Sequence, residues 1–98
     1  MFVREIPVSN QLKSKVFRLG LQVYTTDSQV KISKNQNVPE QMFLSVLDDR
    51  GQQTINDYWR SQNKDTWIDC SRWPNGSYYM SIRDEERKLV KMFEIQKR

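Results

Sequence analysis

The side chains that could perform acid–base, nucleophilic or metal chemistry are few in this chain of 98 residues. It contains no histidine, the commonest general base and the commonest zinc ligand. Its one cysteine, Cys70, follows Asp69 in a segment expected to be buried, and neither burial nor a neighbouring carboxylate favours the reactive thiolate. We therefore interpret Cys70 as a small core residue that has no partner for an internal disulfide.

Five of the 12 acidic residues gather in two polar turns that we expect to be exposed hairpin tips. These turns contain Asp48, Asp49, Asp84, Glu85 and Glu86. Neither turn has the spacing of a calcium loop, which supplies about six to eight oxygen ligands. Paired carboxylates can also cleave glycosidic bonds, but an exposed hairpin tip does not provide the environment that such an acid requires. The sequence therefore predicts no catalytic residue, no metal site and no cofactor, and it indicates that the protein is not an enzyme.

Exposed aromatic side chains are better candidates for a binding site. Trp67 is opposite in phase to Ile68 and should face outward if Ile68 faces the core. Trp59 lies beside a polar loop, while Tyr79 and Phe43 alternate out of phase with their apolar neighbours. We expect Trp67, Tyr79 and Phe43 to form one apolar patch that could anchor a protein, and an exposed ring could instead stack on a sugar. The alternative is that the tryptophans only cover a sheet edge or a loop.

The charge of the chain is basic but dispersed. Lys and Arg number 16 against 12 Asp and Glu, which gives a net charge of +4. No block of five or more like charges occurs, so a solvated surface is favoured over a nucleic-acid interface. The basic residues that could converge with tryptophans near one end are Arg60, Lys64 and Arg72. No apolar run reaches the length of a membrane-spanning helix.

Short strands dominate the predicted secondary structure, because apolar residues recur with period two. The expected strands cover residues 17–23, 29–33, 42–47, 52–58, 67–70, 77–83 and 88–96. About seven strands at intervals of about 8–12 residues predict an all-β, two-sheet antiparallel sandwich. We assign residues 16–98 to this domain and residues 1–15 to an N-terminal segment or first edge strand. A helix over residues 10–19 is the less favoured alternative.

A structural corner is predicted between two of these strands. Pro74 cannot donate to a ladder and so ends pairing, and Gly76 permits the positive φ of a tight reversal. Tyr78 then returns to the core, and Trp73 is expected to be buried there as well. These four residues are predicted to shape the fold and need no chemical role.

The same region carries a family resemblance. Residues 68–82 read Ile-Asp-Cys-Ser-Arg-Trp-Pro-Asn-Gly-Ser-Tyr-Tyr-Met-Ser-Ile, which resembles the pattern I-D-L-S-x-L-P-x-G-x-Y-x-L-x-I. An Asp-x-x-Gly hairpin at residues 44–51 and a final strand at 91–95 complete the order. Over residues 16–96 the chain is similar to two related groups from Gram-negative bacteria. One comprises small secreted immunoglobulin-like domains of unknown function, and the other is the C-terminal sorting domain of type nine secretion cargo.

The resemblance implies an immunoglobulin-like sandwich, an extracytoplasmic location and no catalytic residues. Cys70 and Trp73 stand where leucine is usual, and no cargo domain precedes the sandwich, which favours the stand-alone group. The N-terminus has no apolar core of signal-peptide length, so we expect a secreted or periplasmic chain whose leader has been removed, with a cytoplasmic chain as the alternative. We expect a protein partner or self-association; the alternative is a carbohydrate-binding module that uses Trp59, Trp67 or Tyr79.

Overall fold

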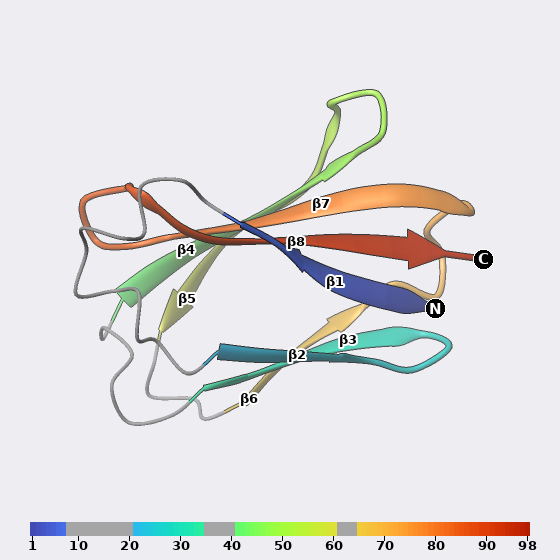
Figure 1. Cartoon of the computed structure of the whole chain (residues 1–98), viewed down its shortest axis with the longest axis horizontal. Coiled ribbons are helices and arrows are strands. Elements are labelled where there is room, and N and C mark those ends of the chain that lie inside the picture. Colours follow the sequence, from blue (N-terminus) through green and yellow to red (C-terminus); the bar gives the residue numbers. More distant parts are fainter. Residues whose placement is uncertain (8–20, 35–40, 61–64) are drawn as a thin grey trace.

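In a computed structural model of the chain, the regular structure of the described residues consists of strands (Figure 1). The structure describes residues 1–7, 21–34, 41–60 and 65–98, and within strands the side chains of residues 34, 56–60 and 90 are outside the description. Within these ranges, no helix is long and apolar enough to cross a membrane. The strands are β1 (Phe2–Ile6), β2 (Leu21–Thr25), β3 (Gln29–Lys34), β4 (Gln41–Asp48), β5 (Gln53–Arg60), β6 (Asp65–Asp69), β7 (Gly76–Arg83) and β8 (Leu89–Lys97).

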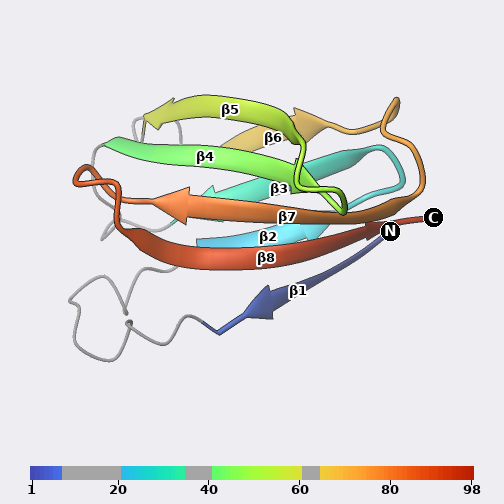
Figure 2. The ribbon, with the colours of Figure 1, turned by 90° about the horizontal axis from the view of Figure 1, so that it is seen from above.

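Two antiparallel sheets form the sandwich. The larger sheet has the order β1-β8-β7-β4-β5, and the smaller has the order β2-β3-β6 (Figure 2). The predicted all-β sandwich is therefore confirmed, with eight strands in the described residues where about seven were expected. The additional strand, β1, forms one edge of the larger sheet. It pairs with β8 from Phe2 opposite Gln96 to Ile6 opposite Met92. The helix considered over residues 10–19 and the predicted strand residues 17–20 lie outside the described residues.

The core lies between the inner faces of the two sheets, as period-two alternation requires. In β3 the inward residues Val30 and Ile32 are fully buried, and in β4 the inward positions are also buried. The other buried apolar residues are Leu21, Met42, Leu44, Val46, Ile68, Cys70, Tyr78, Met80, Ile82, Phe93 and Ile95. Each large apolar side chain removed from water contributes roughly 1.5–3 kcal/mol, so this inner layer is the main stabilising term of the fold.

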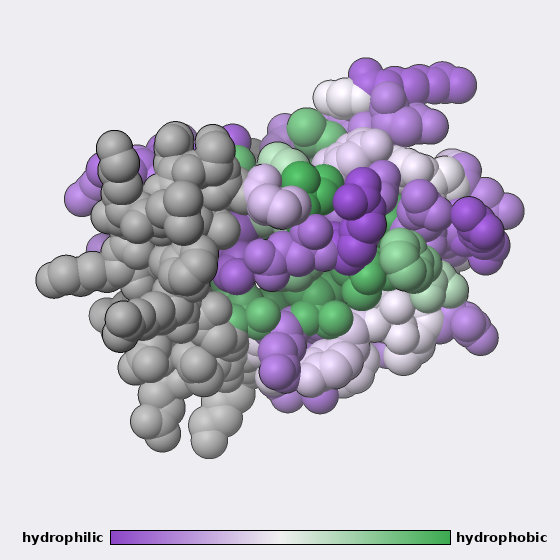
Figure 3. Space-filling model, viewed as in Figure 1, coloured by the Kyte–Doolittle hydropathy of each residue, from purple (hydrophilic) through white to green (hydrophobic). Residues whose placement is uncertain are grey.

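The two sheets approach along the seam between β1 and β2. Thr25 Oγ1 donates a hydrogen bond of 3.3 Å to the backbone oxygen of Met1 across this seam. Val3 and Val23 are only partly buried and pack against the core from β1 and β2. Figure 3 shows apolar surface along the same seam. The core is thus less completely enclosed here than between the centres of the sheets.

The β4–β5 and β7–β8 hairpins close with the same kind of turn. In each turn an aspartate side chain, Asp48 or Asp84, accepts two backbone N–H hydrogen bonds of 2.8–2.9 Å. The fourth turn residue has positive φ, 79° at Gly51 and 66° at Arg87. Because a left-handed backbone suits glycine better than arginine, the second turn stores strain that the first avoids. These two aspartates therefore have a structural function in the turns.

Candidate functional site

The corner before β7 is built around a buried tyrosine. Tyr78 is 4% exposed, and its hydroxyl donates a hydrogen bond of 2.5 Å to the backbone oxygen of Pro74. The Trp73 ring lies against it, with ring centroids 4.6 Å apart. Gly76 has a φ of 153°, and a Cβ built on it would lie 3.8 Å from an oxygen of Asp49. The structure thus brings the four predicted corner residues together, although Trp73 is only half-buried.

Burial and two nearby carboxylates keep the Tyr78 hydroxyl protonated. Burial is the main cause that raises the pKa of Tyr78 above its ordinary value, and the carboxylates of Asp48 and Asp49 raise it further. A protonated phenol can donate to the Pro74 carbonyl at every pH at which the protein would normally work. The corner is therefore fixed by a hydrogen bond that does not titrate near neutrality.

A lysine at the end of β8 joins the two sheets. Lys97 follows the inward phase of Phe93 and Ile95 and is itself buried. Its ammonium group donates to the backbone oxygen of Cys70 and, at 2.9 Å, to that of Ser71. These carbonyls follow directly on β6, a strand of the smaller sheet. Lys97 therefore connects the last strand of one sheet to the end of a strand in the other.

Cys70 lies in the core beside this contact. Its thiol is buried, and Sγ lies 3.6 Å from Sδ of Met1. Burial is the main cause that raises the pKa of the Cys70 thiol, and it outweighs the opposing effect of the Lys97 ammonium. A thiol with a raised pKa has little of the thiolate that nucleophilic attack requires.

We expect Cys70 to react with iodoacetamide at least about a hundredfold more slowly in the native protein than in the guanidinium-unfolded chain. The reason is that alkylation requires an exposed thiolate, and the fraction of unfolded molecules in a stable domain is about 10⁻³ or less. Mass spectrometry of timed samples at pH 8 measures both rates. Equal rates in the two states would show that the thiol is accessible in the folded protein.

The outer face of the larger sheet carries an apolar centre. We call the surface formed by Phe43, Leu47, Tyr79 and Met92 the large-sheet face. Leu47 lies opposite Tyr79 in the β4–β7 register, and Met92 lies opposite Ser81 in the β7–β8 register. Ser45 and Ser81 occupy the outward register between the Leu47–Tyr79 pair and Phe43, and all four apolar side chains are half-buried. The Arg87 guanidinium lies over the Phe43 ring, 5.0 Å from its centroid. This stacking holds a cation at the border of the apolar centre.

An ion pair borders the same face on its β1 side. Arg4 Nε donates to Glu94 Oε1 at 2.6 Å, and Glu94 lies opposite Tyr79 in the β7–β8 register. The Glu94 side chain is almost covered, whereas the Arg4 side chain remains largely exposed. The face therefore combines an apolar centre with exposed guanidinium groups at opposite borders.

The outer face of the smaller sheet carries a different arrangement. Tyr24, Lys31 and Trp67 lie side by side in register on β2, β3 and β6, and we call them the small-sheet row. Tyr24 is 51% exposed and Trp67 is 52% exposed. Lys31 Nζ lies 5.1 Å from the Trp67 ring centroid and 3.5 Å from Asp65 Oδ2. Two exposed rings thus flank a lysine that is already paired.

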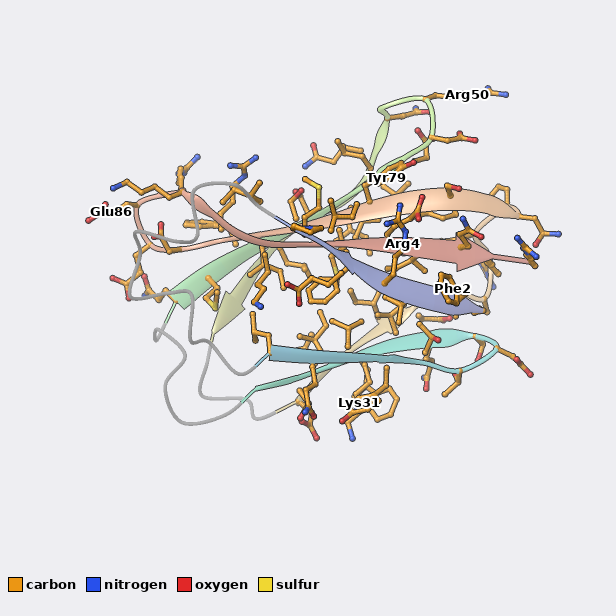
Figure 4. All side chains as sticks on the ribbon, viewed as in Figure 1. Phe2, Arg4, Lys31, Arg50, Tyr79 and Glu86 are labelled. Atoms are coloured by element: carbon orange, nitrogen blue, oxygen red, sulfur yellow. The ribbon has the colours of Figure 1, made fainter. Side chains whose placement is uncertain are left out.

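The aromatic residues singled out in the sequence do not form the single patch that was expected. Trp67 belongs to the smaller sheet, whereas Phe43 and Tyr79 belong to the larger one. Figure 4 shows Tyr79 and Lys31, the neighbour of Trp67, on opposite sides of the molecule. The expectation of one patch was wrong because alternation assigns a residue to an outer face without saying which sheet has that face. Trp59 pairs with Met42 in the β4–β5 ladder, and its side chain lies outside the described residues.

Sequence reasoning also missed Tyr24 and Lys31. A signal for Tyr24 was present, because it is out of phase with the inward residues Leu21 and Val23. The alignment of Tyr24 with Trp67 through Lys31 had no local signal, since it depends on the registers of three strands that are distant in the sequence. Among the described residues, no group of three or more metal-ligating side chains lies close enough together to hold an ion.

Comparison with known proteins identifies relatives in sequence and in fold. The family model of the secretion system C-terminal sorting domain matches residues 25–96. A crystal structure of a DUF3244 family protein with an immunoglobulin-like β-sandwich fold, from Bacteroides vulgatus, is similar with a TM-score of 0.73. It is 12% identical in sequence, and the alignment covers 99% of this chain and 95% of that one. No curated protein matches the chain.

Both groups that the corner motif resembles are therefore represented. The likeness to the Bacteroides protein shows that the sandwich is immunoglobulin-like, as the resemblance implied. The family match includes the corner and strands β3 to β7 in full, together with nearly all of β8. Because this match spans most of the sequence, the chain belongs to the secretion system C-terminal sorting domain family.

Proposed function

We propose that the chain is a non-catalytic recognition domain of an exported protein, and that it binds a protein of the export apparatus through the large-sheet face. The single observation that carries this proposal is that four half-buried apolar side chains, Phe43, Leu47, Tyr79 and Met92, share the outer face of the larger sheet. Aromatic residues, methionine and arginine are enriched in protein interfaces. Membership of a family of sorting domains supports export as the setting.

The arrangement of the face also suits a protein partner. Its central side chains are half-buried by their own neighbours, so binding would immobilise few freely rotating groups. At the borders of the face, the Arg4 guanidinium forms an ion pair with Glu94, and the Arg87 guanidinium stacks over the Phe43 ring. An apolar centre that excludes water, with charges around it, is the typical anatomy of an interface hot spot.

We expect the double variant Tyr79→Ser/Leu47→Ser to reduce export of a reporter fused to the chain by at least about tenfold, because central anchors contribute about 2 kcal/mol or more each. The secreted and retained fractions are measured in a bacterium that has the corresponding secretion system. Thermal unfolding of the purified variant verifies that it folds. Tyr24→Ser, the same substitution on the opposite face, is the matched control and should leave export unchanged.

Self-association is the main competing use of the same face. Light scattering after size exclusion, over a wide range of protein concentration, distinguishes the two uses. A monomer at all concentrations leaves the face free for a foreign partner. A dimer that dissociates in the Tyr79→Ser/Leu47→Ser variant, together with normal export of that variant, would contradict the proposal.

The carbohydrate-binding alternative needs a different platform from the one first expected. Tyr79 and Trp67 lie on different sheets, so these two rings cannot contact one ligand chain on a common surface. Trp67 is well exposed and has polar neighbours, which favours sugar over protein at that position. Any sugar site that uses Trp67 must therefore take its remaining residues from the smaller sheet.

A further inference from the structure

We propose that the outer face of the smaller sheet binds an extended, uncharged polysaccharide chain that lies along the small-sheet row of Tyr24, Lys31 and Trp67. The two aromatic side chains are among the most exposed large apolar groups of the described residues. Both residues are in register with Lys31 of β3. Tyr24 lies opposite Lys31 on β2, and Trp67 lies opposite Lys31 on β6. This site is separate from the large-sheet face and does not depend on the export role.

The spacing of the two rings fits a linear ligand. Neighbouring strands lie about 4.8 Å apart, so the backbone positions of Tyr24 and Trp67 are roughly 10 Å apart across β3. A short run of linked pyranose units spans such a distance when the chain runs across the strands. Tyr24 then offers an apolar surface to one sugar unit, and Trp67 offers another on the ring face that Lys31 does not cover.

Hydrogen-bonding groups border the row on both sides. The outward residues of the neighbouring registers are Gln22, Ser33 and Asp65 on one side and Gln29 and Asp69 on the other. They supply amide, hydroxyl and carboxylate groups, which can donate to and accept from sugar hydroxyls. A hydrogen bond from the backbone N–H of Ser71 is the main cause that lowers the pKa of Asp69, so this carboxylate remains an ionised acceptor.

The charges of this face favour an uncharged ligand. Among its described outward side chains, Lys31 is the cation, and Asp65 and Asp69 are carboxylates. Lys31 is already 3.5 Å from Asp65, so it is not available as a full counter-charge for a phosphate or a uronate. A nucleic acid requires unpaired basic residues along its backbone, and the described residues of this face do not supply them.

The composition also distinguishes this face from a protein-docking surface. Its described outward positions hold two aromatic rings and otherwise polar or charged side chains, with no aliphatic residue. A protein interface needs an apolar centre, for which the large-sheet face offers four apolar side chains and the described residues of this face offer no aliphatic side chain. The rings are also held in place, since Tyr24 donates a hydrogen bond to Gln22 and Lys31 contacts Trp67. Less freedom is therefore lost when a ligand binds.

The test is isothermal titration of the 98-residue chain with cellohexaose, laminarihexaose and mannohexaose, and with an oligogalacturonate of equal length as the acidic comparison. We expect at least one neutral oligomer to bind and the acidic one to bind more weakly. Trp67→Ala and Tyr24→Ser should each weaken that binding by about tenfold or more, the loss expected when one stacking ring is removed. Tyr79→Ser, on the opposite face, should bind as tightly as the parent chain.

Folding is verified separately, because both rings are half exposed and their removal should change the melting temperature little. If Trp67→Ala does not fold, Trp67→Leu and Tyr24→Ser provide the same comparison. The proposal is overturned if no neutral oligomer binds more tightly than about 1 mM, if both ring variants bind like the parent, or if the acidic oligomer is preferred. It is also overturned if Tyr24→Ser abolishes export of the fused reporter, since the face would then dock a protein.

Discussion

Replacing Tyr78 by alanine is expected to lower the free energy of unfolding by about 3–5 kcal/mol, the range for aromatic-to-alanine changes in a core. The ring is almost fully buried, packs on Trp73 and carries the hydroxyl that closes the corner on Pro74. The total free energy of unfolding of a small domain is about 5–15 kcal/mol, so the variant should lose a large part of its stability. Equilibrium urea denaturation followed by circular dichroism measures the change.

Two control variants show how much of this loss comes from the hydroxyl of Tyr78 and how much from the buried position of its ring. Tyr78→Phe keeps the ring and loses one hydrogen bond, so we expect a loss of only about 0.5–1.5 kcal/mol. Tyr79→Ala removes the same side chain from the next position, which is half-buried on the outer face, and should cost about 1 kcal/mol. Similar losses for Tyr78→Ala and Tyr79→Ala would show that the corner does not anchor the sandwich as the structure indicates.

The fold could be predicted from the sequence wherever the alternation of apolar residues within a strand indicates which face is buried. Alternation in β4, β7 and β8 indicated the buried residues, because each of these strands packs on the core with one side only. The strand β1 was harder to assign. Phe2 faces solvent while Glu5 lies on the inward phase opposite Phe93, so an edge strand with mixed burial shows little periodicity.

The candidate surfaces were predictable only in part, since a surface is defined by register between distant strands. Trp67 was correctly expected to be exposed from its phase in β6. Its neighbours Tyr24 and Lys31 come from β2 and β3, which are more than thirty residues away in the sequence. Alternation within a single strand has no information on which strands become neighbours, and this is why one patch was expected where the structure has two faces.

Replacing Lys97 by methionine is expected to lower the free energy of unfolding by about 2–3 kcal/mol. Hydrogen bonds from a charged donor contribute about 1.5–3 kcal/mol, and a buried acceptor left without a donor is destabilising by a similar amount. Lys97 makes two such bonds, to the backbone oxygens of Cys70 and Ser71. Methionine keeps most of the apolar stem of lysine, so the measured loss in urea denaturation reports mainly on these bonds.

Lys91→Met on the same strand is the matched control. Lys91 Nζ lies 3.2 Å from Glu5 Oε2; the Lys91 side chain is largely covered, but the Glu5 side chain is 43% exposed. The pair is therefore partly solvated, and we expect it to contribute about 1 kcal/mol or less. A clearly larger loss at Lys97 than at Lys91 would identify the connection between the sheets as the cause. Equal losses would contradict it.

This contrast bears on how a sandwich with a single cysteine holds its sheets together. Antibody domains of the immunoglobulin fold use a disulfide between the sheets, a solution that is closed to a chain whose one cysteine is Cys70. In this chain the backbone oxygen of that same residue accepts a hydrogen bond from Lys97 at the end of the opposite sheet. Such a contact resists separation of the sheets and, unlike a disulfide, forms without oxidation, so the Lys97→Met variant should lose stability equally in the presence and absence of a reducing agent.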